Sequence, residues 1–294
     1  MKNIPWNEIE SGLESIASVE GGNSDAKRGI VTLSNDEKIF VKIGGDDRTK
    51  EWANKEIRSY AFLKDHSYKY IPQFLSTNED QSGFAIEALL SENGWDWKDN
   101  WSDERLQATL VATDALADIK PDSKYAELLK PVISDDDNGW PKLFASKELQ
   151  ASIREKLSEF DKDLILGGIN SHVEKASHFK VRHDTLVHDD VRADNCAWNA
   201  QLKEVKLVDW NWLELGDRRL DLAAFLVHIH KDGFDVLKDH RNRLDADALH
   251  WMAGFWFEAA SKPIWPGGPE KLRNIQLRAG ITALKLSKEI EENK

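Results

Sequence analysis

Two carboxylates and an amide stand at the ends of two short apolar segments in the second half of the chain. Asp190 and Asn195 follow the segment Leu186–Val187. Asp209 closes the segment Val205–Val208. Because short apolar runs of this kind are typical of strands, a loop and a neighbouring strand end would hold the three side chains around a common point. Phosphoryl transfer uses such a set, in which a carboxylate orients a hydroxyl and oxygen ligands hold the Mg²⁺ of a nucleotide.

The order of the motifs makes this stretch specific. The pattern His188-x-Asp190-x-x-x-x-Asn195 with a later metal-binding Asp is typical of kinase catalytic loops. Three blocks occur in order, namely VHDDVRADN at 187–195, LVDWN at 207–211 and GDRRLDLA at 216–223. A lone His-x-Asp arises often by chance, whereas the ordered set does not. In these blocks the sequence resembles the aminoglycoside phosphotransferase and choline kinase-like family of small-molecule kinases.

The resemblance implies a reaction and a role for each of these side chains. Asp190 is expected to be the catalytic base, and Asn195 and Asp209 are expected to hold Mg²⁺. The co-substrate would be ATP, with GTP open, and the acceptor would be a hydroxyl of a small molecule. An unperturbed carboxylate is a weak base near neutral pH, so Asp190 would mainly orient the hydroxyl and take its proton late.

Three neighbouring residues are expected to shape the catalytic loop. His188 is expected to be structural, with its ring bonded to nearby backbone. Asp189 stands where small-molecule kinases commonly carry glycine, so the fine shape of the loop differs from that of the family. Asp221 resembles the family's aspartate that anchors this loop. Its neighbours Leu220 and Leu222 are apolar, and a lone buried carboxylate is costly, so Asp221 needs a hydrogen-bond partner.

The N-terminal part of the chain supplies a nucleotide-binding pattern. Strand signals at 29–33 and 38–43 follow a glycine turn, whose backbone N–H groups are suited to phosphate oxygens. The segment GGNSD at 21–25 resembles the family's nucleotide loop. This resemblance implies that Ser24 is among the nucleotide-binding residues. Lys42 takes the position of the lysine that pairs with the α- and β-phosphates. Glu56, on a helix predicted over 47–65, resembles the glutamate that holds this lysine, with Glu51 as the competing candidate.

Two further strands, at 71–75 and 83–90, complete a small sheet. The second is expected to run into a hinge at Glu87 to Leu89, whose backbone bonds the adenine edge in the family. We therefore predict an α+β, two-lobed protein kinase-like fold. Residues 1–90 would form a small, mainly antiparallel β lobe, and residues 91–294 a larger, mainly helical lobe with a catalytic hairpin at 185–212.

Helical periodicity dominates the rest of the sequence. Helices are predicted over 1–17, 102–119, 146–160, 169–179, 220–230, 245–262 and 269–290, with an acidic loop at 134–141. Ser102 and Ser146 are suited to the N-cap positions of their helices. Tryptophans gather at 95–101 and again at 251–256, where Glu258 adds a carboxylate. Such a set suits a cationic substrate, although aromatic residues at helical spacing are more often core.

Composition excludes several classes of protein. A net charge of −12 over 294 residues argues against nucleic-acid binding and suits cationic or neutral small substrates. The single cysteine excludes an internal disulfide and a cysteine-based zinc site. We expect no membrane span, because the longest apolar stretch is short and carries charges, and no secretory signal is visible. We therefore expect a cytoplasmic monomer or homodimer.

Two alternatives to an active kinase stay open. A nucleotide-binding scaffold without turnover, a pseudokinase, would keep the fold but would have no need of the base Asp190. A metal phosphohydrolase would use the His-Asp pairs at 183–184 and 188–189. Such sites usually present their pair on helices, whereas the second pair here follows a strand signal. The phosphohydrolase hypothesis also leaves the strand lysine and the glycine turn unexplained.

Overall fold

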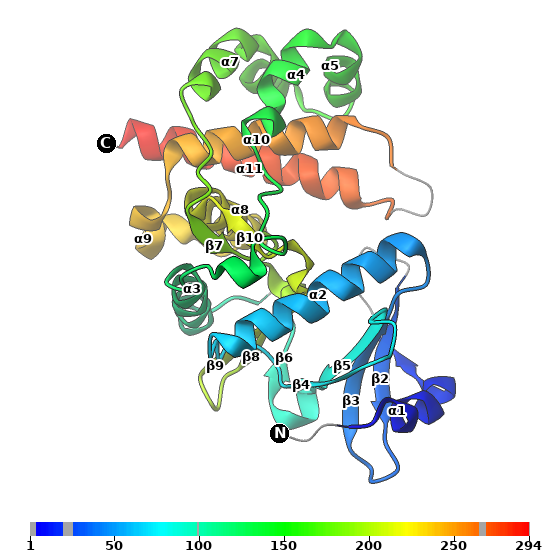
Figure 1. Ribbon diagram of the computed structural model, residues 1–294. Coiled ribbons are helices and arrows are strands. Elements are labelled where there is room, and N and C mark those ends of the chain that lie inside the picture. Colours follow the sequence, from blue (N-terminus) through cyan, green and yellow to red (C-terminus); the bar gives the residue numbers. More distant parts are fainter. Residues whose placement is uncertain (1–3, 20–25, 99, 265–268, 294) are drawn as a thin grey trace. The chain divides into compact units, whose positions relative to one another are not determined.

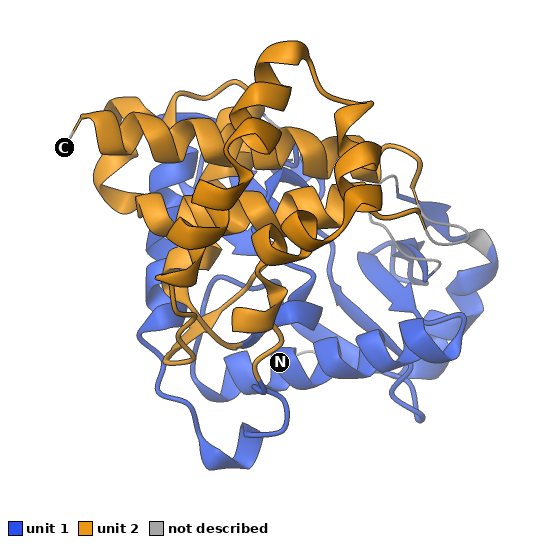
Figure 2. Ribbon diagram, turned by 90° about the horizontal axis from the view of Figure 1, so that it is seen from above, with its two compact units in different colours: residues 1–130, 191–214 blue, residues 131–190, 215–294 orange. Residues whose placement is uncertain are grey.

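The chain, described here from a computed structural model, has a protein kinase-like α+β fold, as predicted, with an antiparallel sheet in its N-terminal part and mainly helices in its C-terminal part (Figure 1). The structure describes residues 4–19, 26–98, 100–264 and 269–293. Two compact units account for the chain (Figure 2): residues 1–130 with 191–214, and residues 131–190 with 215–294. We call them unit 1 and unit 2. The lobe boundary near residue 90 stays a prediction. The two compact units meet instead at residues 130/131, 190/191 and 214/215.

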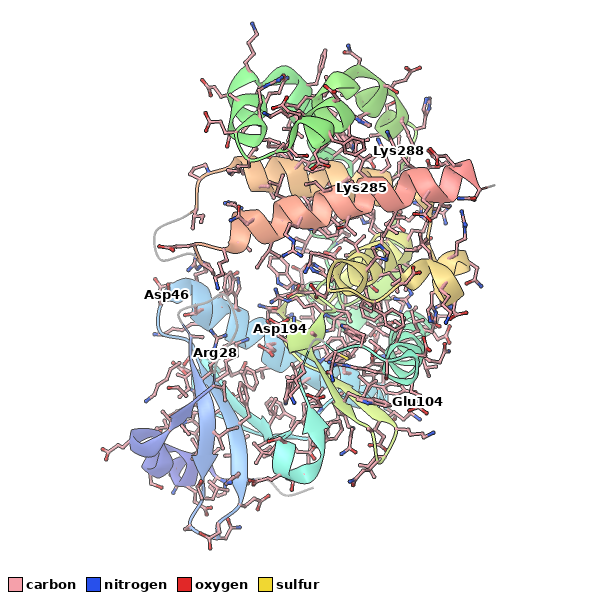
Figure 3. The ribbon with its side chains drawn as sticks, turned by 180° about the vertical axis from the view of Figure 1, so that it is seen from behind. Arg28, Asp46, Glu104, Asp194, Lys285 and Lys288 are labelled. Carbon is pink, nitrogen blue, oxygen red and sulfur yellow. The ribbon has the colours of Figure 1, made fainter. Side chains whose placement is uncertain are left out.

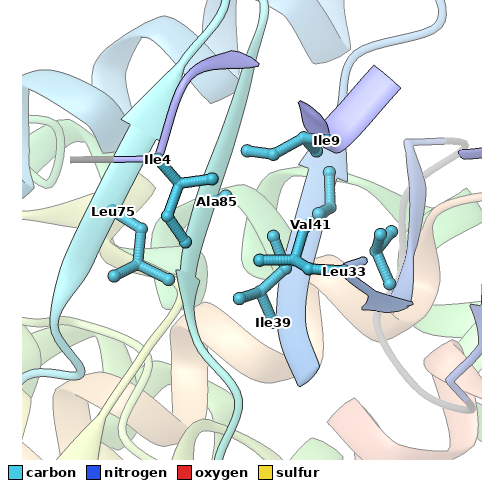
Figure 4. Packing of buried hydrophobic residues seen from close by; sticks show 8 residues of the cluster. Ile4, Ile9, Leu33, Ile39, Val41, Leu75 and Ala85 are labelled. Atoms are coloured by element: carbon cyan, nitrogen blue, oxygen red, sulfur yellow. The ribbon is translucent and has the colours of Figure 1, made fainter. Parts of the chain in front are cut away.

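Unit 1 begins with a five-stranded antiparallel sheet in the order β1-β2-β3-β5-β4. The strands are β1 (Ala17–Ser18), β2 (Lys27–Thr32), β3 (Lys38–Ile43), β4 (Phe74–Thr77) and β5 (Gly83–Glu87). Successive strand residues face opposite sides of a sheet. Ile39 and Val41 therefore share one face and pack in a core with Ile9 of the N-terminal helix α1 (Trp6–Gly12) (Figure 4). This alternation directs Lys42 to the opposite face.

The N-terminal helix is shorter than the one predicted over 1–17. Helix α1 ends at Gly12, a 3-10 turn follows at Leu13–Ser15, and the chain then enters β1. Gly12 lies so close to the sheet that a Cβ there would come within 2.4 Å of a Val31 methyl group. Glycine is also a poor helix residue. Gly12 therefore explains both the close packing against the sheet and the early end of the helix.

Helix α2 (Asp47–Asp65) has the predicted bounds. Its start is fixed by a capping box, in which the Asp46 carboxylate accepts from the Thr49 N–H and the Thr49 hydroxyl accepts from the Asp46 N–H. Tyr60 of α2 packs against Phe84 of β5, which pairs in register with Lys42. Helix α2 therefore covers the sheet face to which Lys42 points.

The remainder of unit 1 is a three-stranded antiparallel sheet with one long helix. The sheet has the order β6-β8-β9, with β6 (Trp95–Asp96), β8 (Cys196–Asn199) and β9 (Glu204–Leu207). Strand β8 was not predicted. Helix α3 (Asp103–Ala117) begins as expected, because the Ser102 hydroxyl accepts from the Arg105 N–H. The predicted strand at 205–208 is β9, and it pairs with β8 inside unit 1.

Unit 2 is mainly helical. Its helices are α4 (Gly139–Ala145), α5 (Lys147–Arg154), α6 (Glu159–Lys162), α7 (Ile169–Ser177), α8 (Arg218–Lys231), α9 (Val236–His240), α10 (Ala246–Ser261) and α11 (Leu272–Glu292). The predicted strand at 186–187 is β7 (Thr185–Val187), which pairs with β10 (Glu214–Gly216). Within the described residues, no helix is both long enough and apolar enough to cross a membrane.

One helix prediction and one loop prediction in unit 2 were partly wrong. The helix predicted over 146–160 is two helices, α5 and α6, because Ser158 caps a second start with its hydroxyl on the Asp161 N–H. The predicted acidic loop at 134–141 contains a 3-10 turn and the first residues of α4. Helix α4 packs backbone to backbone on α10, since a Cβ on Gly139 would lie 1.9 Å from the Gly254 carbonyl oxygen.

Candidate active site

Lys42 lies at the centre of a buried ionic cluster inside unit 1. Its Nζ is 2.7 Å from Oε2 of Glu56 and 2.6 Å from Oδ1 of Asp209. Lys42 comes from β3, Glu56 from α2 and Asp209 from the residue that follows Val208 after β9. The Lys42 and Glu56 side chains are only 10% and 3% exposed. The structure therefore brings together three predicted residues that are far apart in sequence. Glu51, the competing candidate, is exposed.

The residues around Asp209 explain why it meets helix α2. Asp209 itself has a left-handed backbone, with φ of 65°, and a 3-10 turn at Trp210–Trp212 follows it. Trp210 is fully buried, and its indole N–H donates to the Leu207 carbonyl over 2.9 Å. The Ser59 hydroxyl of α2 donates to the Trp210 carbonyl over 2.9 Å. The helix that carries Glu56 thus also holds the turn that carries Asp209.

The charges in this cluster set its protonation. Burial by itself lowers the pKa of Lys42, but the carboxylates of Glu56 and Asp209 outweigh it and leave that pKa above its ordinary value. Burial raises the pKa of Glu56 to about 7, against the lowering effect of Lys42. Lys42 is therefore an ammonium at neutral pH. Once Glu56 is also ionised, above about pH 7, two carboxylates surround one ammonium, and a cation at Asp209 would neutralise the extra negative charge.

Asn195 is tied to the strand end that carries Asp209. It closes a 3-10 turn at Ala193–Asn195 and is buried. Its N–H donates to the Arg192 carbonyl, and its own carbonyl accepts from the Val208 N–H, both over 3.0 Å. One amide oxygen and one carboxylate are hard donors that fit Mg²⁺, which proteins commonly hold with one or two carboxylates and substrate phosphates. Among the described residues, no group of three or more His, Cys, Asp or Glu side chains is placed to hold a metal.

The first half of the predicted catalytic loop belongs to unit 2. There the His188 ring accepts from the Asp190 N–H, with 3.4 Å between Nδ1 and the backbone nitrogen, as a structural histidine would. Asp221 is buried and has the partners that it was predicted to need. Its Oδ1 accepts from the Asp189 N–H over 3.0 Å, and its Oδ2 pairs with Arg218 over 2.6 Å. Asp221 therefore anchors the backbone next to the predicted base.

The backbone of Asp189 accounts for the departure from glycine at this position. Its φ is 60°, in the left-handed region that glycine adopts without strain. Aspartate is one of the few other residues that visit this region readily. The loop therefore keeps a conformation that favours glycine while carrying a side chain. Asp190 follows directly and is the last residue of this stretch of unit 2, five positions before Asn195 in unit 1.

The predicted hinge contains a buried backbone donor at Leu89. Leu89 is buried, and its N–H has no hydrogen-bond partner among the described residues. Its carbonyl accepts from the Trp97 indole over 2.8 Å. Glu87 is exposed and bonds to Gln73 through both its backbone N–H and its carboxylate. Buried N–H groups are rarely left unpaired in proteins, so the Leu89 donor suits a ligand atom. Ser24 and its glycine turn lie outside the described residues.

The aromatic residues of α10 lie mostly in the core. Trp251 is 1% exposed, and Trp256 is buried with its ring edge-on to His228. Glu258 is buried and pairs with Lys262 over 2.5 Å. The sequence did not point to Arg105 of α3, whose guanidinium group is buried against the turn that carries Asn195. Its only signal in the sequence is a charge next to the apolar positions of the helix predicted over 102–119.

Comparisons with known proteins place the fold among small-molecule kinases. No family model matches the sequence, and no curated protein matches it. Choline kinase LicA from Streptococcus pneumoniae superposes with a TM-score of 0.56 at 13% identity, covering 95% of this chain and 98% of that one. The GDP and kanamycin complex of APH(2")-IIia gives a TM-score of 0.58 at 16% identity, with 98% of each chain covered. An aminoglycoside phosphotransferase from Alicyclobacillus acidocaldarius gives 0.53 at 11% identity, covering 99% of this chain and 98% of that one.

Proposed function

We propose that this protein is a phosphotransferase that moves the γ-phosphate of ATP to a hydroxyl group of a small molecule. The observation that carries the proposal is the buried bonding of Lys42 to both Glu56 and Asp209, in a chain with the fold of small-molecule kinases. A buried lysine shared by two acids is expensive to build, and phosphoryl transfer gives each of the three a task.

Each side chain then has one role. Lys42 binds the α- and β-phosphates, and Glu56 holds it in place. Asn195 and Asp209 would hold the Mg²⁺, which would neutralise charge on the phosphates. Asp190 orients the acceptor hydroxyl and takes its proton. The hydroxyl oxygen forms a bond to the γ-phosphorus as the bond to the bridging oxygen of ADP breaks.

The hinge favours ATP over GTP as the nucleotide. Adenine presents an acceptor at N1, which the unpaired N–H of Leu89 can satisfy. Guanine presents a donor at N1, which the Leu89 N–H cannot satisfy because it is itself a donor. Glu87 would contribute its backbone to the same base edge, and Ser24 would lie in the phosphate loop. GTP stays the alternative.

The acceptor is a small molecule with a hydroxyl group, and a cationic one fits best. The net charge of −12 suits a cationic ligand. The compounds named for two of the similar structures, choline and kanamycin, both carry positive charge.

The direct test is ADP formation with Mg–ATP and a panel of aminoglycosides, choline, amino alcohols, sugars and nucleosides. We expect one class to stimulate ADP release, and Asp190→Asn to lower that rate by roughly 10²–10⁴-fold. Asp194→Asn is the matched control, because Asp194 is a half-exposed carboxylate on the same loop (Figure 3). Mg–ATP that raises the melting temperature without any acceptor-dependent ADP release would favour the pseudokinase scaffold instead.

A further inference from the structure

Arg105 is a buried cation that binds backbone carbonyls. It lies on α3 inside unit 1 and is 1% exposed. Among the described residues, no Asp or Glu oxygen lies within ion-pairing distance of its guanidinium group. A buried unpaired charge is costly, and other groups satisfy the two Nη nitrogens of Arg105, whereas its buried Nε has no hydrogen-bond partner among the described residues. The groups that satisfy the Nη nitrogens show what the residue is for.

The guanidinium group binds backbone carbonyls on both sides of Asn195. Its Nη2 donates to the Cys196 carbonyl over 2.7 Å and, more weakly, to the Ala193 carbonyl over 3.4 Å. Its Nη1 donates to the Lys98 carbonyl, and the Trp101 ring lies 4.3 Å from the guanidinium carbon. A guanidinium group presents its donors in a rigid planar fork, so these contacts fix directions as well as distances.

A second residue of α3, Thr109, contacts the same segment next to Asn195. Thr109 lies one turn after Arg105 on α3 and is fully buried. Its hydroxyl is 3.3 Å from Sγ of Cys196, the residue that follows Asn195. Residues four apart on a helix face the same side, so Arg105 and Thr109 together hold one short segment. That segment is the turn at Ala193–Asn195 and the first residue of β8.

We propose that Arg105 is a positioning residue for the metal ligand Asn195, with Thr109 as its second point of attachment. The inference rests on the proposed function, which assigns Asn195 to Mg²⁺. Asn195 contributes a neutral amide oxygen, whose orientation is set by the backbone that carries it. Holding the carbonyls of Ala193 and Cys196 fixes the backbone before and after Asn195. The cation stays buried because the carbonyls of Lys98, Ala193 and Cys196 accept from its two Nη nitrogens.

The test is metal binding, measured by electron paramagnetic resonance with Mn²⁺ in the presence of a non-hydrolysable ATP analogue. Arg105→Lys keeps the positive charge but removes the fork. We expect it to raise the Kd for Mn²⁺ on the order of 10–100-fold, as loss of outer partners of metal ligands does. Its Kd for the nucleotide analogue in EDTA should equal that of the wild type, because base and phosphate contacts are untouched. A merely structural role would weaken both affinities or neither.

Thr109→Val keeps the test decisive if Arg105→Lys fails to fold. We expect a smaller rise in the Kd for Mn²⁺, of a few-fold. Thr113→Val is its control, since Thr113 is equally buried one turn further along α3 and its hydroxyl donates to Leu110 within the helix. Wild-type Mn²⁺ affinity in a folded Arg105→Lys or in Thr109→Val would overturn the inference. A wild-type protein that binds no Mn²⁺–nucleotide would overturn the proposed function as well.

Discussion

At the scale of residues, the site depends on one lysine that serves two acids. A strand lysine is usually solvated, yet Lys42 is buried because β3 directs it to the face that α2 covers. Removing one member of a buried ion pair costs more than the pair contributes, because it leaves an uncompensated charge. The cluster of Lys42, Glu56 and Asp209 is therefore a place where stability and proposed function depend on the same side chains.

Lys42→Met should destabilise the protein in a pH-dependent way. Burial raises the pKa of Glu56 to about 7, against an ordinary value of 4.5, and loss of Lys42 would raise it further. A carboxyl whose pKa is raised by folding stabilises the fold below its unfolded pKa, and this contribution is lost as pH rises towards the folded pKa. We expect a loss of about 3–5 kcal/mol in the free energy of unfolding at pH 8 and a smaller loss at pH 6.

Urea unfolding at the two pH values measures this difference. Lys38→Met is the matched control on the same strand, because Lys38 and its partner Glu92 are exposed. Exposed pairs contribute about 0–1 kcal/mol, with little dependence on pH in this range. Equal losses for Lys42→Met at pH 6 and pH 8 would show that Glu56 does not take up the proton.

At the scale of elements, the sequence predicted the bounds of those helices and strands that short-range interactions determine. Helix α2 and strand β3 have the predicted bounds, because the capping box of Asp46 and Thr49 and the alternation of Ile39, Val41 and Ile43 are both short-range. Strand β8 was missed because all four of its residues are buried and it follows the Asn195 turn without a break. No period-2 pattern marks such a strand.

A buried histidine pair joins three helices of unit 2. Nδ1 of His172 on α7 is 3.0 Å from Nε2 of His250 on α10, and both rings stack on Trp140 of α4. Burial, with the nearby charges of Lys175 and Lys288, lowers the pKa of His250 to about 3. Burial also lowers the pKa of His172. Both rings are therefore neutral in the folded protein at pH 7.

This pair should make unit 2 sensitive to acid. A histidine whose pKa is lowered by folding stabilises the fold above its unfolded pKa of about 6.5, and that contribution is lost as pH falls towards the folded value. Between pH 7.5 and 5.0 we expect the His250 contribution to fall by about 2 kcal/mol, or roughly 4–8 °C in Tm. His250→Phe keeps the stacking and should show a smaller fall than the wild type.

Thermal unfolding monitored by circular dichroism across this pH range is the measurement. His178→Phe serves as the control, since His178 lies just after α7 and is exposed. The same slope of Tm against pH in His250→Phe and the wild type would contradict a role for the buried pair.

At the scale of the whole molecule, the sequence predicted the fold class, because the ordered motif blocks resemble one family of kinases. Contacts between distant segments could not be predicted from the sequence where no motif marks the residues involved. Arg105 and Cys196 are 91 positions apart, and neither carries a pattern that would point to the other. Lys42 and Asp209 are 167 positions apart, and each was singled out in advance only because it stands in a motif whose family role is known; their direct bond was not predicted.

The most direct test of the central claim is isothermal titration of the protein with ATP, once with Mg²⁺ and once with EDTA. If Lys42, Asn195 and Asp209 form a metal–nucleotide site, the wild type binds Mg–ATP more tightly than free ATP. Asp209→Asn should then remove most of this difference, and Lys42→Met should weaken binding under both conditions. Binding of Mg–ATP at wild-type affinity by both variants would contradict the account.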